Sequence, residues 1–295
     1  MKNSEMLGIR SDDLSASIVK GLLERNPNID KEEIEDLVTG CAFPEGPQGM
    51  LMARSISILA DLPISTGGKV VNRFCGSSMD SVHQVSQAII AGDIKSGIAS
   101  GVEDMFTVPM GGFVPDFNPR LNEEEFYIGM GDTAENLAKE LDINRSDQED
   151  FSVLSHKKAL DAIKGARFEN EIIPIEFNGK TFSRDEGPRT PDIEKMKSLS
   201  PAFDAGGSIT AATSSPISLG ASAILIGNQD MADNSKSVFE IVSRSVVGVD
   251  WKTMGQGPLP ATEKALKNAG LSFGDIDIIE LNEAFAAQSL YVIRK

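Results

Sequence analysis

The stretch that decides the fold lies at residues 69–79 and reads KVVNRFCGSSM. It opens with β-branched residues, which favour a strand, and passes through Cys75 and Gly76. The apolar residues that follow recur at helical spacing: Met79, Val82, Val85 and Ile89. A strand that turns directly into a helix is the building block of α/β folds. We therefore expect an α/β protein with Cys75 at or just before the amino terminus of a helix, which Gly92 would end.

Two roles are open to Cys75 from this segment alone. Unpaired amides and the helix dipole at a helix amino terminus stabilise a thiolate, and Gly76 leaves room for a ligand beside the sulfur. These features favour a nucleophile. Cysteine is also among the most buried residue types, so a position in the core is the other interpretation.

The composition excludes several classes of protein. The chain has 295 residues, with 28 basic and 44 acidic side chains and a net charge of −16, which argues against a nucleic-acid or membrane-surface partner. An anionic ligand must therefore find local positive charge. Two cysteines form no disulfide framework, no Cys-x-x-Cys or histidine cluster suggests a metal, and no apolar run is long enough to cross a bilayer. With no signal-peptide pattern at the start, we expect a cytoplasmic location.

Patterning along the chain predicts three parts. Residues 1–105 alternate helical and strand patterns, which is typical of α/β layering. A stretch rich in Pro and Gly opens near residue 106, and a returning strand is expected at about 218–235. We therefore expect an inserted domain at 106–217 and a second α/β part at 236–295.

Periodicity also predicts individual elements. Helices are expected at 14–23, 49–59, 132–141, 145–164 and 259–268, with Ser146 and Glu149 as a capping-box pair. Strands are expected at 34–38, 70–74, 222–226, 238–247 and 276–281.

A self-comparison indicates a duplication. Residues 33–43 align without gaps on residues 275–285, at an offset of 242, and a helical pattern precedes each copy. Two distant copies suggest a duplicated α/β unit rather than a solenoid, with a chance match as the alternative. The second-half counterpart of Cys75 would then lie beyond Lys295.

Asn282 and Glu283 follow the strand expected at 276–281. Ligand sites in α/β sheets favour the carboxyl ends of strands. An asparagine there can hold a water or donate to an oxyanion, and a carboxylate can orient it. The alternative is a helix N-cap, which both residue types suit.

A base for Cys75 is harder to find, because the chain has two histidines. His83 lies eight residues further along the same predicted helix, about 12 Å away at 1.5 Å per residue. His156 lies in a polar Ser-His-Lys-Lys segment that favours a solvated helix face. Neither histidine is expected to take the thiol proton.

Five segments occur in the order seen in thiolases: 71–78, 101–105, 130–136, 207–215 and 282–288. The chain thus resembles a 3-ketoacyl-CoA thiolase, or acetyl-CoA C-acyltransferase, over nearly its whole length. The cysteine block and the Asn-Glu-Ala-Phe block are specific to that family, and the second argues against a decarboxylating ketoacyl synthase. The resemblance implies two βαβαβαββ halves in a five-layered α/β/α/β/α arrangement, with a coenzyme A-binding loop domain inserted in the first half.

The resemblance also implies roles for individual residues. Cys75 would be the acylated nucleophile in a ping-pong reaction of fatty acid β-oxidation, or its reversal by Claisen condensation. Asn282 would hold the water of one oxyanion hole beside Glu283, and the Cys75 amide would serve the other. Six positions match contacts of the family with coenzyme A: Met130, Leu199, Phe203, Ala211, Ser215 and Phe285. Coenzyme A and acyl-CoA would be substrates, with no permanently bound cofactor and a homodimer or homotetramer as the assembly.

Departures from the family pattern lead to a further expectation. The Gly-His-Pro-x-Gly and Cys-x-Gly motifs of the family are absent, the opening segment is short, and Leu219 stands where an aspartate is usual. The chain is therefore expected to be a fragment, cut at the carboxyl end and slightly at the amino end, with an incomplete second half and little or no turnover. The alternative function is a catalytically silent chain that only binds coenzyme A or a partner.

Overall fold

The chain folds into two units, seen in a computed structural model that describes residues 4–233, 235 and 237–295. One unit joins Met1–Pro115 with Glu171–Asp185 and Ile217–Ile241. The other joins Asp116–Asn170 with Glu186–Pro216 and Val242–Lys295. Each unit is made of segments that are distant in the sequence.

A four-stranded mixed sheet organises the first unit, in the order β2-β1-β3-β6. Strand β1 (Asp36–Gly40) runs parallel to β2 (Lys69–Val71) on one side and to β3 (Ser96–Asp104) on the other. Strand β6 (Leu219–Gly227) returns from far along the chain and pairs antiparallel with β3. The strands expected at 34–38, 70–74 and 222–226 therefore exist, with shifted ends.

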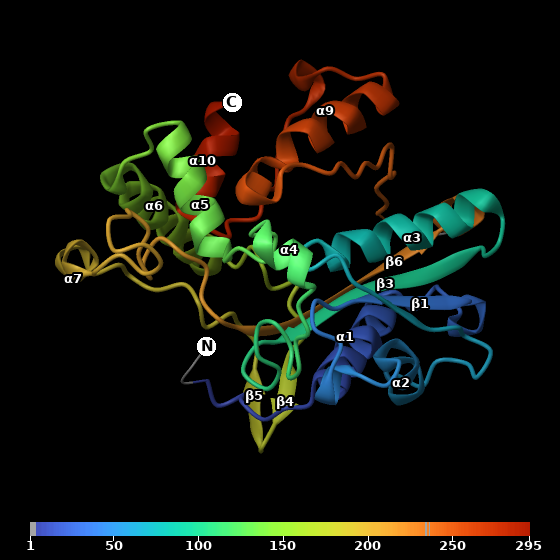
Figure 1. Cartoon of the computed structure of the whole chain (residues 1–295). Coiled ribbons are helices and arrows are strands. Elements are labelled where there is room, and N and C mark those ends of the chain that lie inside the picture. Colours follow the sequence, from blue (N-terminus) through green and yellow to red (C-terminus); the bar gives the residue numbers. More distant parts are fainter. Residues whose placement is uncertain (1–3, 234, 236) are drawn as a thin grey trace. The chain divides into compact units, whose positions relative to one another are not determined.

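Helices cover both faces of this sheet (Figure 1). Helices α1 (Ser11–Arg25) and α2 (Met52–Leu59) pack on one face, and α3 (Ser77–Ala91) packs on the other. Successive residues of β1 point to opposite faces of the sheet: Leu37 packs on the face covered by α1 and α2, and Val38 packs on the face covered by α3. Residues 37–40 of β1 are accordingly all buried, whichever face they point to. The α/β class is confirmed.

The amino end of α3 approaches the strands unusually closely. A Cβ atom added at Gly40 would lie 2.3 Å from the Ser77 carbonyl carbon, and one added at Gly101 would lie 1.8 Å from the Ser78 Oγ. Only glycine permits this contact. Glycines at the carboxyl ends of β1 and near the middle of β3 thus set where α3 begins and, with it, where Cys75 lies.

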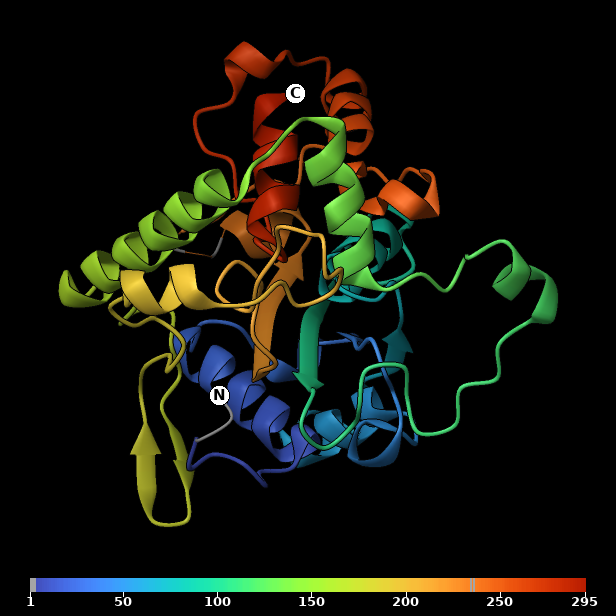
Figure 2. The ribbon, with the colours of Figure 1, turned by 60° about the vertical axis from the view of Figure 1, so that its left-hand side comes forward.

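A short hairpin completes the first unit. Strands β4 (Ile175–Phe177) and β5 (Lys180–Phe182) form a separate two-stranded ribbon, which Figure 2 shows apart from the four-stranded sheet. Ile175 anchors it in a cluster with Ile9 and Leu14. A short helix α8 (Gln229–Asp233) follows β6.

The second unit is helical. Its core contains Leu137, Ile143, Ile209, Ala287 and Tyr291. Helix α10 (Ala286–Arg294) packs on α5 (Met130–Glu140) and α6 (Arg145–Lys164) around this core. The second unit also contains the helices α4 (Pro119–Glu123), α7 (Ile193–Ser198) and α9 (Pro258–Ala269).

Three local predictions are wrong. Residues 238–247 and 276–281 are not strands, because in the described chain they find no strand to pair with, and a strand needs a partner for its backbone groups. The cap of α6 is Asn144, whose side chain accepts from the Asp147 amide, so Ser146 and Glu149 form no capping box. The helices predicted at 14–23, 49–59, 132–141, 145–164 and 259–268 are confirmed as α1, α2, α5, α6 and α9, with ends that differ by a few residues where they differ.

The duplicated segments have similar local structure. A 3₁₀ turn at Lys31–Glu33 leads into β1, and a 3₁₀ turn at Phe273–Asp275 lies at the same offset of 242 residues. Both turns end in an isoleucine with extended backbone, Ile34 and Ile276. The two copies therefore agree in conformation up to the point where the first one joins the sheet.

We expect Gly40→Ala to lower the free energy of unfolding by about 1–3 kcal/mol, because the added methyl group would overlap the Ser77 backbone. Gly220→Ala in β6 is the matched control, since nothing lies within 4 Å of its added Cβ. Both changes restrict the unfolded chain similarly, so the difference between them in urea denaturation reports the contact. Equal stabilities of the two variants would contradict this account of the α3 position.

Candidate functional site

Cys75 lies on the turn between β2 and α3. Its side chain is exposed, Gly76 is the N-cap residue of α3, and the helix begins at Ser77. At the other end, Gly92 adopts a left-handed conformation and terminates α3. The predicted place of Cys75 is confirmed, and its interpretation as a buried core residue is wrong.

The turn is strained immediately before the cysteine. Phe74 has φ +45°, a left-handed value that costs a residue with a side chain roughly 1–3 kcal/mol. Hydrogen bonds on both sides maintain it: the Phe74 amide donates to the Asn72 side-chain oxygen at 2.8 Å, and the Ser77 amide donates to the Phe74 carbonyl at 2.9 Å. The Cys75 amide donates to no acceptor among the described residues. The turn thus presents a thiol and a free amide together.

Glu103, near the carboxyl end of β3, supports this turn indirectly through the loop that follows β1. Its carboxylate accepts from the amides of Ala42 at 2.6 Å and Phe43 at 3.3 Å, and from the Gln48 side chain at 3.0 Å. The loop so fixed contacts the cysteine turn, because the Asn72 side chain donates to the Ala42 carbonyl. The rings of Phe43 and Phe74 also touch, with centroids 5.8 Å apart.

The second cysteine has a different environment. Cys41 is buried, and its thiol lies 3.8 Å from a Glu103 carboxylate oxygen. Burial, assisted by the negative charge of Glu103, raises the pKa of Cys41 to about 12. Cys41 is therefore a packed thiol rather than a nucleophile.

The six positions matched to coenzyme A contacts all lie in the second unit. The rings of Phe203 and Phe285 meet edge to face, 5.7 Å between centroids, and Phe203 lies against Gly131 at the start of α5, next to Met130. The Ser215 amide donates to the Ala284 carbonyl, one residue before Phe285. Leu199 caps the carboxyl end of α7. The structure thus brings Met130, Phe203, Ser215 and Phe285 into one neighbourhood.

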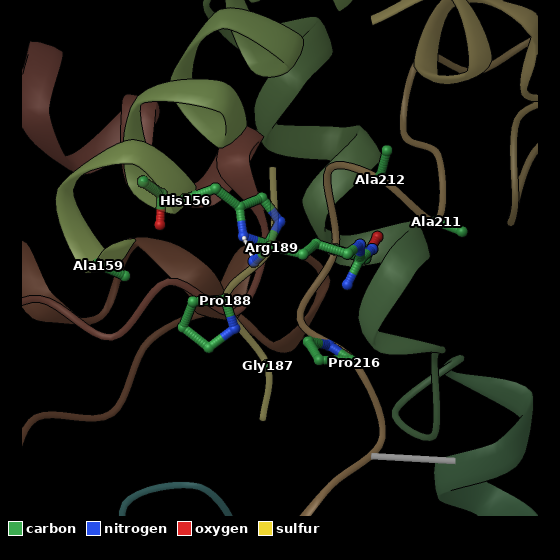
Figure 3. Close-up of a pocket in the computed structure, with 10 residues that line it drawn as sticks. His156, Ala159, Gly187, Pro188, Arg189, Ala211, Ala212 and Pro216 are labelled. Carbon is green, nitrogen blue, oxygen red and sulfur yellow. Dashed lines mark hydrogen bonds between the residues drawn. The ribbon is translucent and has the colours of Figure 1, made fainter. Parts of the chain in front are cut away.

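Ala211 lines a pocket of about 220 Å³ within this unit (Figure 3). One wall is α6, and the others are the loop that carries Arg189 and the small-residue loop that follows Thr210. Its lining residues are Ser155, His156, Ala159, Gly187, Pro188, Arg189, Ala211, Ala212, Ser214 and Pro216. Small side chains on one side and a cation on the other suit a ligand with an anionic group.

The polar groups of the pocket are electrostatically coupled. The Arg189 amide donates to the His156 Nδ1 at 3.4 Å, and the Ser155 hydroxyl donates to a Glu283 carboxylate oxygen at 2.6 Å. Burial and the positive charge of Arg189 lower the pKa of His156, against an opposing effect of Glu283. The ordinary pKa of histidine is about 6.5, so an imidazole with a lowered pKa is neutral near pH 7. The positive charge of the pocket is therefore that of Arg189.

The remaining predicted residues are placed as follows. Asn282 and Glu283 are exposed in the second unit, and Cys75 belongs to the first. Asn282 is not a helix cap, because α10 begins after Phe285, so the N-cap interpretation is wrong. His83 lies on α3 within the first unit.

His156 and Arg189 are pocket residues that were not predicted from the sequence. His156 was predicted to be solvated, but it is half-buried against Arg189. The available signal was the net charge of −16, which requires an anionic ligand to find a local cation.

Two features of the described residues bear on other functions. Within residues 4–233, 235 and 237–295, no three His, Cys, Asp or Glu side chains converge as metal ligands would. No helix in the same part of the chain combines the length and apolarity needed to span a membrane.

Comparison with known proteins gives a consistent result. Residues 2–230 match the family model "Thiolase, N-terminal domain", and residues 235–295 match "Thiolase, C-terminal domain". A 3-ketoacyl-CoA thiolase of Marinomonas sp. is 43% identical over 99% of this chain and 78% of its own length. A 3-ketoacyl-CoA thiolase of Vibrio vulnificus is 44% identical over 95% of this chain and 75% of its own length. A 3-ketoacyl-CoA thiolase of Aliivibrio salmonicida is 45% identical over 99% of this chain and 78% of its own length.

In the folded chain, iodoacetamide should modify Cys75 and leave Cys41 intact. Cys75 is exposed, whereas at about pH 8 only about one Cys41 thiol in ten thousand is a thiolate, given its pKa of about 12. Peptide mass spectrometry after timed labelling measures both rates, and labelling in denaturant shows that both thiols can react. Equal labelling in the folded state would refute the assignment.

Opposite changes are expected in the pKa of His156 from two substitutions. Arg189→Gln removes a cation that disfavours the protonated imidazole, so it should raise the pKa of His156. Glu283→Gln removes an anion that favours the protonated imidazole, so it should lower the pKa of His156 further. NMR titration of the imidazole measures both. Because the folded state binds this proton less readily than the unfolded state, His156 makes stability rise with pH up to about pH 6.5, and His156→Gln should weaken that dependence. A shift of the same sign in both variants would contradict the proposed coupling.

Proposed function

The chain belongs to the thiolase family, and we propose that it transfers acyl groups by thiolysis of 3-ketoacyl-CoA. This is the activity for which its relatives are named, and they match nearly the whole chain. The observation that carries the proposal is the exposed Cys75 thiol on a strained turn at the amino end of α3. No observation favours the alternative of a silent chain.

The proposed reaction has two half-reactions. The Cys75 sulfur attacks the 3-keto carbon and forms a thioester while the bond between carbons 2 and 3 breaks. Carbon 2 takes a proton and leaves as acetyl-CoA. The thiolate of a second coenzyme A then attacks the acyl carbon, forms the shortened acyl-CoA and returns Cys75 as the thiolate.

The oxyanions that form on the way need donors. The free Cys75 amide, next to the helix amino terminus, is proposed to stabilise the charge on the thioester oxygen. Asn282, which is exposed and makes no hydrogen bond through its side chain to a described residue, is proposed to hold a water for the other oxyanion. Glu283 is proposed to orient this group.

Coenzyme A is proposed as a substrate held by the second unit, with no cofactor bound permanently. The aromatic pair Phe203 and Phe285 with Met130 offers apolar contact to its pantetheine, and Leu199, Ala211 and Ser215 complete the predicted set. Arg189 supplies the cation that an anionic ligand needs in this acidic chain. A homodimer or homotetramer, a cytoplasmic location and a role in β-oxidation stay predictions.

Turnover of this 295-residue chain should be slow. His83 is not suited to take a proton from the Cys75 thiol, because it lies eight residues further along α3. Transfer to Cys75 should therefore be easier to observe than repeated cycles.

The proposal is tested by incubating the chain with acetoacetyl-CoA and mapping acetylated peptides by mass spectrometry. Acetyl-Cys75 and an equal amount of acetyl-CoA are expected from the wild-type chain and from Cys41→Ala, but not from Cys75→Ala. A folded wild-type chain whose Cys75 reacts with iodoacetamide but never with acetoacetyl-CoA would exclude the proposed function.

A further inference from the structure

An ion pair closes the turn that carries Cys75. The Arg73 Nε lies 3.2 Å from a carboxylate oxygen of Asp80, which belongs to the first full turn of α3. The Asp80 side chain is 8% exposed and the Arg73 side chain 52% exposed. The pair therefore joins the residue two positions before the cysteine to a nearly buried anion five positions after it.

The Arg73 side chain passes beside the turn on its way to Asp80. Its Cγ and Cδ atoms lie 3.9 Å from the position that a Gly76 Cβ would occupy. The methylene groups thus pack against the residue that follows Cys75, and the guanidinium reaches the helix beyond it. We call this arrangement the Arg73–Asp80 clamp.

Backbone contacts make the clamp part of the turn. The Arg73 amide donates to the Ser77 hydroxyl at 2.8 Å, and the Gly76 amide donates to the Arg73 carbonyl at 3.0 Å. At the other end, the Asp80 amide donates to the Gly76 carbonyl at 2.9 Å. The left-handed Phe74 lies inside this closed segment, so release of the clamp would allow the strained backbone to relax.

Asp80 is itself held in place. Its second carboxylate oxygen accepts from the Gln84 side chain one helical turn later, at 3.1 Å. An acidic residue in the first turn also interacts favourably with the helix dipole. The Asp80 carboxylate therefore has a fixed position on α3, and the Arg73 guanidinium pairs with it there.

We infer that Arg73 and Asp80 are positioning residues that keep Cys75 in its reactive geometry at the amino end of α3. The inference rests on the proposed role of Cys75. A half-exposed ion pair contributes little to global stability, so the expected effect is local to the nucleophile.

The test measures the rate at which iodoacetamide modifies Cys75 in the folded chain. This reagent is neutral, so Arg73 does not attract it. Arg73→Met, which retains a long apolar side chain, should lower the rate about tenfold, because small displacements of a reacting group have effects of this size or larger. Arg73→Lys can still reach Asp80 and should restore part of the rate.

Asp80→Asn distinguishes an effect of position from an effect of charge. It leaves the cation of Arg73, two residues before Cys75, without its counter-ion, so electrostatics alone would make the alkylation of Cys75 faster. Positioning predicts that it becomes slower, and that the double variant is no slower than Arg73→Met, because both changes break one interaction. A faster reaction or additive losses would overturn the inference.

Arg10→Met is the matched control. Arg10 also pairs with an aspartate of the first unit, Asp12, at 2.8 Å, and the two side chains are 59% and 13% exposed. This variant should alkylate as the wild type does, and all variants should keep similar melting temperatures. If Arg73→Met matches Arg10→Met in rate, the clamp has no positioning role. Failure of the proposed function has a different signature, because wild-type Cys75 would then react with iodoacetamide but not with acetoacetyl-CoA.

Discussion

The close approach of α3 to the strands is the contact on which the rest of the first unit depends. Gly40 and Gly101 lack the Cβ atoms that would hold Ser77 and Ser78 away from the sheet. Because the helix begins against β1 and β3, the chain that leaves β2 has only a short turn in which to reach it. The left-handed Phe74 and the exposed Cys75 are consequences of that short connection.

The strained turn persists because independent groups hold it from three directions. Asn72 connects it to the loop that Glu103 fixes, Ser77 closes it from within, and Arg73 ties it to Asp80 on the helix. Strain before a nucleophile is useful, since it keeps the thiol and the free amide in one orientation without reorganisation during the reaction. The two cysteines show the contrast: Cys41 packs beside a carboxylate, whereas Cys75 projects from a constrained turn.

The second unit, which is proposed to hold coenzyme A, must provide local positive charge for this anion, because the chain has a net charge of −16. It concentrates small residues, an aromatic pair and Arg189 within one helical framework. Burial beside Arg189 leaves His156 neutral, so the positive charge of the pocket resides on the guanidinium. This division suits binding of an anion at physiological pH without dependence on histidine protonation.

The sequence by itself determined the α/β class, the helix after Cys75 and the family, because these follow from periodicity and from short motifs that act locally. It could not determine that residues 276–281 remain unpaired, since a strand exists only with a partner, nor that Asn144 rather than Ser146 caps α6. Only the tertiary structure decided between a buried and an exposed Cys75, and only it brought Arg189 to His156. Burial and charge proximity depend on residues distant in the chain, which no local pattern encodes.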